Sequence, residues 1–143
     1  MKRHPALQPL SDDHHRALVL GRRLRRADPA ALAALAHEVR RAAEAELEPH
    51  FGVEERVLLP LLRAKGADAL VARTEADHAR VRELVRGAWS LDAARALGEL
   101  LERHVRFEER ELFPEAEALL SEAELATVRA ATPNDPRRGR GST

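Results

Sequence analysis

Apolar residues recur along this chain at three- and four-residue intervals, the spacing that places side chains on one face of an α-helix. The third such stripe, for example, holds Leu70, Val71, Val81 and Val85. No segment alternates apolar and polar residues as a half-buried strand does. The stripes predict helices over residues 11–27, 29–65, 68–86 and 91–119, with a short fifth helix over 121–131.

Short polar residues and glycine mark the ends of these predicted helices. Ser11 and Ser90 stand where an N-cap would accept the first free backbone N–H groups. Gly66 follows the second stripe, as a C-terminal glycine does. Ser121 and Glu124 have the spacing of a capping box, which starts the short last helix.

The connections between the four long stripes are short, which predicts an all-α, up-down-up-down four-helix bundle. Pro49 and Pro60 lie inside the second stripe, and each removes one backbone hydrogen bond and can bend that helix. We expect residues 1–10 to form an N-terminal arm, 11–131 the bundle, and 132–143 a disordered tail.

Composition narrows the range of functions. A chain of 143 residues with 34% charged and 44% hydrophobic residues is typical of one globular domain. It has 24 basic and 24 acidic side chains, so we expect neither nucleic acid nor a membrane as partner. The absence of cysteine excludes disulfides and thiolate metal sites. No signal peptide or spanning segment is visible, so we expect a cytoplasmic location.

One sequence motif occurs twice. Residues 50–60 (HFGVEERVLLP) and 104–114 (HVRFEERELFP) share the His, both Glu, the Arg, one Leu and the Pro in register. In each copy the His and the first Glu stand four residues apart, on one helix face. That face also carries Leu47 and Leu58 in the first copy, and Leu101 and Leu112 in the second. Both His/Glu pairs are therefore predicted to point into the bundle.

The other two helices each supply one inward histidine. His78 falls between Thr74 and Val81 on the third stripe. On the first helix, His14 and His15 are both candidates. His14 is preferred because its face continues into apolar positions, and because Asp13-His14-His15-Arg16 matches Asp77-His78-Ala79-Arg80. The candidate ligands are His14, His50, Glu54, His78, His104 and Glu108.

A single histidine on an apolar stripe is usually an ordinary core residue. Several buried imidazoles and carboxylates together are different, because each buried charge costs several kcal/mol unless it is compensated. A pair of cations is the simplest compensation, and mixed nitrogen and oxygen ligands suit iron, manganese or zinc. Glu55, Glu109, Arg56 and Arg110 lie off the stripe. We interpret them as solvent-exposed ion pairs, in preference to the alternative that they form hydrogen bonds to the ligands.

The Asp-His-His segment, the two His-x-x-x-Glu-Glu motifs and Asp77-His78 together resemble the hemerythrin-like, HHE cation-binding family over residues 10 to about 120. The resemblance implies a four-helix bundle holding two Fe ions with an oxo, hydroxo or water bridge, with Mn or Zn as alternatives. Glu54 and Glu108 would bridge the ions, and the four histidines would be terminal ligands.

One position departs from the oxygen-carrying members, which have a further histidine where this chain has Thr74. The resemblance therefore favours the bacterial single-domain members over the respiratory carriers. We expect a protein that binds O2, NO or peroxide as a sensor, store or scavenger. The alternatives are a di-iron redox enzyme acting on peroxide or nitric oxide, and a structural or metal-reporting site. Contributions from His15, Thr74 or Glu75 to the site stay open, as does the oligomeric state.

Overall fold

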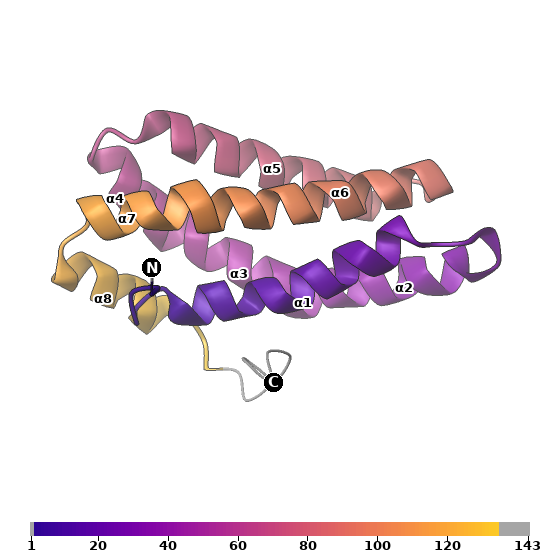
Figure 1. Cartoon of the computed structure of the whole chain (residues 1–143), viewed down its shortest axis with the longest axis horizontal. Helices are drawn as coiled ribbons and strands as arrows, with labels where there is room; N and C mark the ends of the chain where they lie inside the picture. The colour runs from indigo at the N-terminus through magenta and orange to yellow at the C-terminus, as the bar shows by residue number, and fades with distance from the viewer. Residues whose placement is uncertain (1, 135–143) are drawn as a thin grey trace.

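A computed structural model describes residues 2–134 of the chain, and among these residues every regular element is helical. The long elements lie alongside one another (Figure 1). α1 packs most extensively on α6, and α5 packs on α6, α4 and α2. The elements are α1 (Gln8–Arg25), α2 (Leu32–Ala42), α3 (Glu48–Val53), α4 (Leu59–Ala64), α5 (Asp68–Arg86), α6 (Leu91–Phe107), α7 (Phe113–Leu119) and α8 (Glu122–Ala131). The predicted all-α class is confirmed for the part of the chain that is described.

The first helix begins earlier than the sequence suggested. α1 starts at Gln8, with Leu7 before it and no side chain capping its N-terminus. The predicted N-cap at Ser11 is therefore wrong, and the Ser11 hydroxyl instead donates a hydrogen bond to Glu109 Oε2 at 2.6 Å. Leu7 and Leu10 are completely buried, so this end of the chain contributes to the core. The burial of these side chains outweighs the missing cap.

The second predicted helix is one continuous helical rod from Pro29 to Ala64, with a 3-10 turn at its start. Two π-helical segments interrupt its α-helical geometry, Ala43–Leu47 and Glu54–Leu58, and a third, Glu108–Leu112, separates α6 from α7. Each π segment ends two residues before a proline, namely Pro49, Pro60 or Pro114. Proline has no N–H and crowds the carbonyl four residues earlier, and that residue lies inside the π segment in all three cases. The wider helix accommodates the prolines without ending the rod.

The predicted helix ends from Gly66 onward are confirmed. Gly66 has φ +88° after α4, as a helix-terminating glycine does. Ser90 accepts a hydrogen bond from the Ala93 N–H at 3.0 Å. Ser121 and Glu124 form both bonds of a capping box, at 3.1 and 2.9 Å.

The core consists of two apolar clusters. One includes Leu7, Leu10, Leu62 and Phe113 and is closed by α8. The other includes Leu24, Val39, Val81, Leu97 and Leu101. The described part of the chain has four long helical rods: α1, residues 29–64, α5 and residues 91–119. Along each rod, residues of the two clusters flank a buried histidine; on α1, for example, His14 separates Leu10 from Ala17. The bundle therefore has a polar layer between two apolar ends.

The predicted disordered tail is only partly described. Thr132 is 4% exposed, and its hydroxyl donates to the Val128 carbonyl at 2.9 Å, so the tail does not begin at this residue. Residues 135–143 lie outside the described part of the chain. Within the described part, no helix is both long enough and apolar enough to cross a membrane.

Candidate metal centre

The six residues predicted as ligands meet in the polar layer. His14 lies on α1, His50 on α3, His78 on α5 and His104 on α6, while Glu54 and Glu108 are each the first residue of a π-helical segment. All six are buried: both glutamates and His78 are 0% exposed, and the other histidines are 3–7% exposed. Elements far apart in the sequence thus bring these side chains together.

The Nε2 atoms of the imidazoles face the two glutamates. His14 Nε2 is 2.8 Å from Glu108 Oε1, and His104 Nε2 is 3.2 Å from Glu108 Oε2. On the other side, Glu54 Oε2 is 3.2 Å from His50 Nε2, and Glu54 Oε1 is 3.0 Å from His78 Nε2. Each carboxylate therefore lies between two imidazoles that come from different rods.

The atoms at the centre lack hydrogen-bond partners. His50 Nε2, His78 Nε2, His104 Nε2, both Glu54 oxygens and Glu108 Oε2 are buried without one. Such orphaned polar atoms are rare in native proteins, and each requires an explanation. Two cations at the centre would satisfy them all.

The six residues form two overlapping groups. One contains His14, His50, Glu54 and Glu108, and the other contains Glu54, His78, His104 and Glu108. Within each group, one ligand atom from every residue lies within 4.8 Å of the others. Both glutamates belong to both groups, which is the arrangement that two neighbouring cations with shared carboxylates require. Imidazole and carboxylate together are a donor set for iron, manganese or zinc.

A second ring of carboxylates holds the outer nitrogens of the imidazoles. Asp13 Oδ2 contacts His50 Nδ1 and Asp77 Oδ2 contacts His104 Nδ1, both at 2.9 Å. Asp13 and Asp77 are positioning residues that sequence reasoning missed, although the repeated Asp-His-x-Arg pattern was a signal for them. A carboxylate on Nδ1 fixes the ring and directs Nε2 at a metal, as outer partners of histidine ligands do.

Glu55 and Glu109 complete this ring, which corrects the prediction that both are solvent-exposed ion pairs. Glu55 Oε2 lies 2.7 Å from His78 Nδ1, and Glu109 Oε2 lies 2.6 Å from His14 Nδ1. Both side chains are 30% exposed. The prediction considered only which face of its own helix each Glu occupies, whereas the imidazole that it contacts comes from another helix. Arg56 and Arg110 are exposed, as expected.

Two arginines hold these outer glutamates in turn. Arg82 donates to Glu55 at 2.8 and 3.1 Å and also contacts Glu48. Arg3 donates to the carboxylate of Glu109 at 3.1 Å and to its backbone carbonyl at 2.9 Å. Although burial raises the pKa of both glutamates, their hydrogen bonds outweigh it and lower the pKa below the ordinary value.

The centre has an internal two-fold pattern. Asp13 binds a histidine of the first motif copy, and Asp77 binds the equivalent histidine of the second copy. Glu55 and Glu109 instead bind histidines contributed by the opposite half of the chain. The second Glu of each repeated motif therefore links the two halves around the centre.

The protein alone, without a cation, balances its buried charges by proton sharing. Burial favours neutral imidazole, but Glu54 and Glu108 outweigh it and raise the pKa of His50 well above its usual value and that of His104 to about 10. Burial likewise raises the pKa of Glu108, yet the facing imidazoles hold it well below the ordinary value. Protons on the histidines and cations at the centre thus compete for the same nitrogens.

Phenylalanine rings stack on two of the imidazoles and meet a third edge-on. Phe51 stacks on His78 with 3.8 Å between ring centroids, and Phe113 stacks on His14 at 5.5 Å. Phe51 also meets His104 edge-on at 6.0 Å. These rings restrict the orientation of the imidazoles and surround them with apolar side chains.

The remaining candidates lie outside the two groups. His15 is partly exposed on α1. Glu75 is exposed and forms an ion pair with Arg63 at 3.2 Å. Thr74 is fully buried, but its hydroxyl donates to the Leu70 carbonyl of its own helix at 2.8 Å. Among the described residues, neither metal group includes any of the three.

Comparison with known protein families agrees with this geometry. The family model described as Hemerythrin HHE cation binding domain matches residues 6–116, which include all six candidate ligands. The chain belongs to this family. Searches of curated proteins and of solved structures each find no significant match. Membership and the buried His/Glu cluster together establish a hemerythrin-like, cation-binding domain.

Proposed function

We propose that this hemerythrin-like domain is a non-haem di-iron protein that binds O2, another small diatomic molecule or peroxide, and acts as a sensor, store or scavenger. We further infer that its helices form the up-down-up-down four-helix bundle typical of that role. The single observation that carries the proposal is the pair of overlapping ligand groups that share Glu54 and Glu108.

The ligand set supports two cations with room for a further ligand. Each group offers two imidazoles and two carboxylates. Iron commonly accepts more ligands than these four, so positions would be left for a small molecule. A redox-active metal pair held here would supply electrons and open coordination positions to that molecule.

The chain's own residues would keep this chemistry contained. His14, His50, His78 and His104 would be terminal ligands, each aligned by a carboxylate on Nδ1. The apolar clusters on both sides of the centre limit its contact with bulk water. A centre enclosed in this way favours the binding of a small ligand.

The proposal is tested by the metal content of protein purified without added metal, together with its absorption spectrum. We expect two iron ions per chain and a change in the spectrum when the reduced protein meets air. Repeated turnover of peroxide or nitric oxide would indicate the enzyme alternative instead. Metal without any redox response would indicate a structural site.

A further inference from the structure

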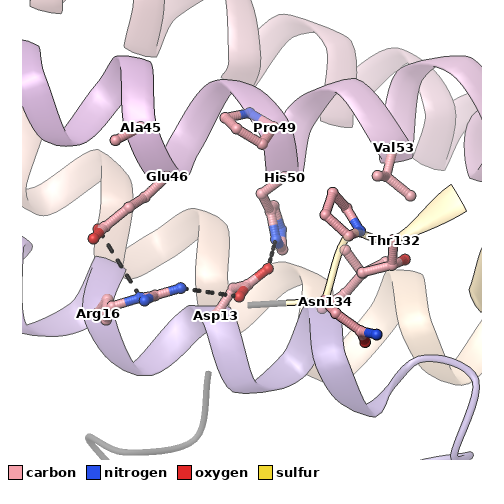
Figure 2. Close-up of a pocket in the computed structure, with 11 residues that line it drawn as sticks. Asp13, Arg16, Ala45, Glu46, Pro49, His50, Val53, Thr132 and Asn134 are labelled. Carbon is pink, nitrogen blue, oxygen red and sulfur yellow. Dashed lines mark hydrogen bonds and ion pairs between the residues drawn. The ribbon is translucent and has the colours of Figure 1, made fainter. Parts of the chain in front are cut away.

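Two cavities meet at the His50 side of the centre. The outer cavity, about 260 Å³, lies between α1 and α3 and is bordered by the segment after α8 (Figure 2). Ala45, Pro49 and Asn134 on its wall are exposed, so the cavity reaches the protein surface. His50 forms part of its inner wall.

The inner cavity lies next to the outer one and extends toward the second metal group. Both cavities are lined by Asp13, Arg16, Glu46 and His50, and the inner one extends to His104. Its volume is about 30 Å³. Because roughly 10–15 Å³ is enough for one water molecule, this space fits a ligand of about two or three non-hydrogen atoms.

The wall shared by the two cavities is a row of interacting side chains. Figure 2 shows these side chains connected one to the next, from Glu46 through Arg16 and Asp13 to His50. Arg16 Nε lies 4.0 Å from Glu46 Oε2, and Arg16 Nη2 lies 3.4 Å from Asp13 Oδ1. Asp13 Oδ2 in turn lies 2.9 Å from His50 Nδ1. The row ends at His50, which belongs to one metal group, and the inner cavity reaches His104, which belongs to the other. The Nε2 atoms of both histidines are buried without a hydrogen-bond partner.

The other residues of the centre are less accessible. Glu54, Glu108 and His78 are 0% exposed and line neither cavity. Apart from the shared charged row, the route is lined largely by apolar groups such as Leu10, Leu20 and Leu101. Such a lining suits small uncharged or singly charged molecules.

We propose that these two cavities form the route by which a small ligand reaches the metal centre, entering between α1 and α3 beside Asn134 and passing His50. The inner cavity sets the size limit, and ligands larger than about three non-hydrogen atoms are excluded. This inference rests on the proposed function, because it requires metal at the centre.

A neighbouring surface hollow offers a competing entrance. It has a volume of about 410 Å³ and is lined by His15, Val19 and Ala42, among others. It shares Arg16, Leu20 and Glu46 with the inner cavity, but it contains no residue of the centre. The outer cavity is favoured because His50 itself is part of its wall.

The chain contains no cysteine, so a single introduced thiol can be modified selectively. We would compare Ala45→Cys, at the rim of the outer cavity, with Ala42→Cys, in the competing hollow. Each variant is loaded with Co(II), labelled with methanethiosulfonate reagents of increasing size, and mixed with azide. Stopped-flow absorption then gives the association rate, the dissociation rate and Kd.

A blocked route slows entry and exit equally and leaves Kd unchanged. We expect both rates to fall at least tenfold with the largest adduct at position 45, and to change less than twofold with adducts at position 42. Rates unaffected by every adduct at position 45, or slowed only from position 42, would overturn the route. A changed Kd with an unaltered association rate would also contradict it. Failure to take up Co(II) would instead reject the metal centre, and with it the proposed function.

Discussion

At the scale of single residues, the outer carboxylates have the clearest measurable role. Glu55 and Glu109 each contact the Nδ1 atom of an imidazole whose Nε2 faces the centre. They would touch no metal themselves and so act by positioning a ligand. Loss of either one should therefore reduce metal affinity less than loss of Glu54 or Glu108.

Replacing Glu55 or Glu109 with Gln should weaken metal binding about 10- to 100-fold, the usual effect of losing an outer partner of a histidine ligand. Glu54→Ala and Glu108→Ala should lose most of the bound metal. Competition with a chromophoric chelator measures all four affinities. Glu75→Gln is the matched control, because Glu75 is exposed and forms an ion pair with Arg63 rather than with a histidine of the centre. If Glu55→Gln binds metal as tightly as this control, the positioning role is wrong.

The raised pKa of His104 gives a second expectation at this scale. Its pKa is about 10 in the folded protein without metal, against an ordinary value of 6.5. The folded state therefore binds this proton more tightly than the unfolded state, and the resulting stability is fully present below pH 6.5. It is lost as the pH rises toward 10.

Thermal unfolding of the metal-free protein should accordingly shift to lower temperature between pH 6.5 and pH 10. The metal-loaded protein should lose less stability over the same range, because bound cations replace the protons on the imidazoles. Differential scanning calorimetry at several pH values compares the two forms. Parallel pH profiles for both forms would show that the imidazole protons do not compete with metal.

At the scale of elements, the approach of α1 to α6 depends on glycine. A Cβ atom added at Gly98 would lie 2.6 Å from the Gly21 carbonyl oxygen and 3.1 Å from the Arg25 nitrogen. Both are backbone atoms, so the two helices would have to separate. These helices carry His14 and His104, and the same separation would disturb the centre.

Gly98→Ala should therefore lower the free energy of unfolding by about 1–3 kcal/mol, the usual cost of overpacking. Gly52→Ala is the control, because the nearest atoms to an added Cβ there belong to the flexible side chain of Arg56, which is exposed, and not to backbone. That control should be neutral or more stable by up to about 1 kcal/mol, since alanine favours a helix more than glycine does. Urea unfolding measures the free energy of unfolding of both variants. Equal changes in the two would contradict the close contact between α1 and α6.

The repeated motif also belongs to this scale. In both copies the first Glu begins a π-helical segment, and a proline follows that segment two residues after its end. The sequence located the motif and its prolines, but it predicted a bend at Pro60, made no prediction for Pro114, and did not indicate the wider helical turns. Whether a proline bends the helix or widens it into a π-helical segment depends on how the flanking helix packs against other elements. The local sequence does not specify that packing.

At the scale of the whole molecule, the buried polar layer joins residues from all four long rods. Without cations, protons on the imidazoles offset the buried carboxylates, whereas with cations the same groups would clamp the rods. Metal binding should therefore be a large part of the domain's stability. Binding to the folded state alone adds about 2.7 kcal/mol at a free metal concentration 100 times Kd.

Removal of metal by a chelator should lower Tm, and added Fe(II) under anaerobic conditions should restore it. Glu108→Ala should show little dependence of Tm on metal, because it removes a residue common to both ligand groups. Circular dichroism during heating measures each case. An unchanged Tm after complete removal of metal would mean that the apolar clusters alone hold the bundle together.

The sequence by itself determined the helical class, most helix ends in the second half, and the six residues of the inner layer. These features follow from local periodicity and from residue types that recur at fixed spacing, so one stretch of chain is enough to reveal them. The early start of α1, the π-helical segments, the outer carboxylates and the cavities beside His50 were decided only by the tertiary structure. Each depends on which atoms of distant rods meet, as when Glu109 contacts His14 across 95 positions of the chain. No spacing along a single helix encodes such a contact.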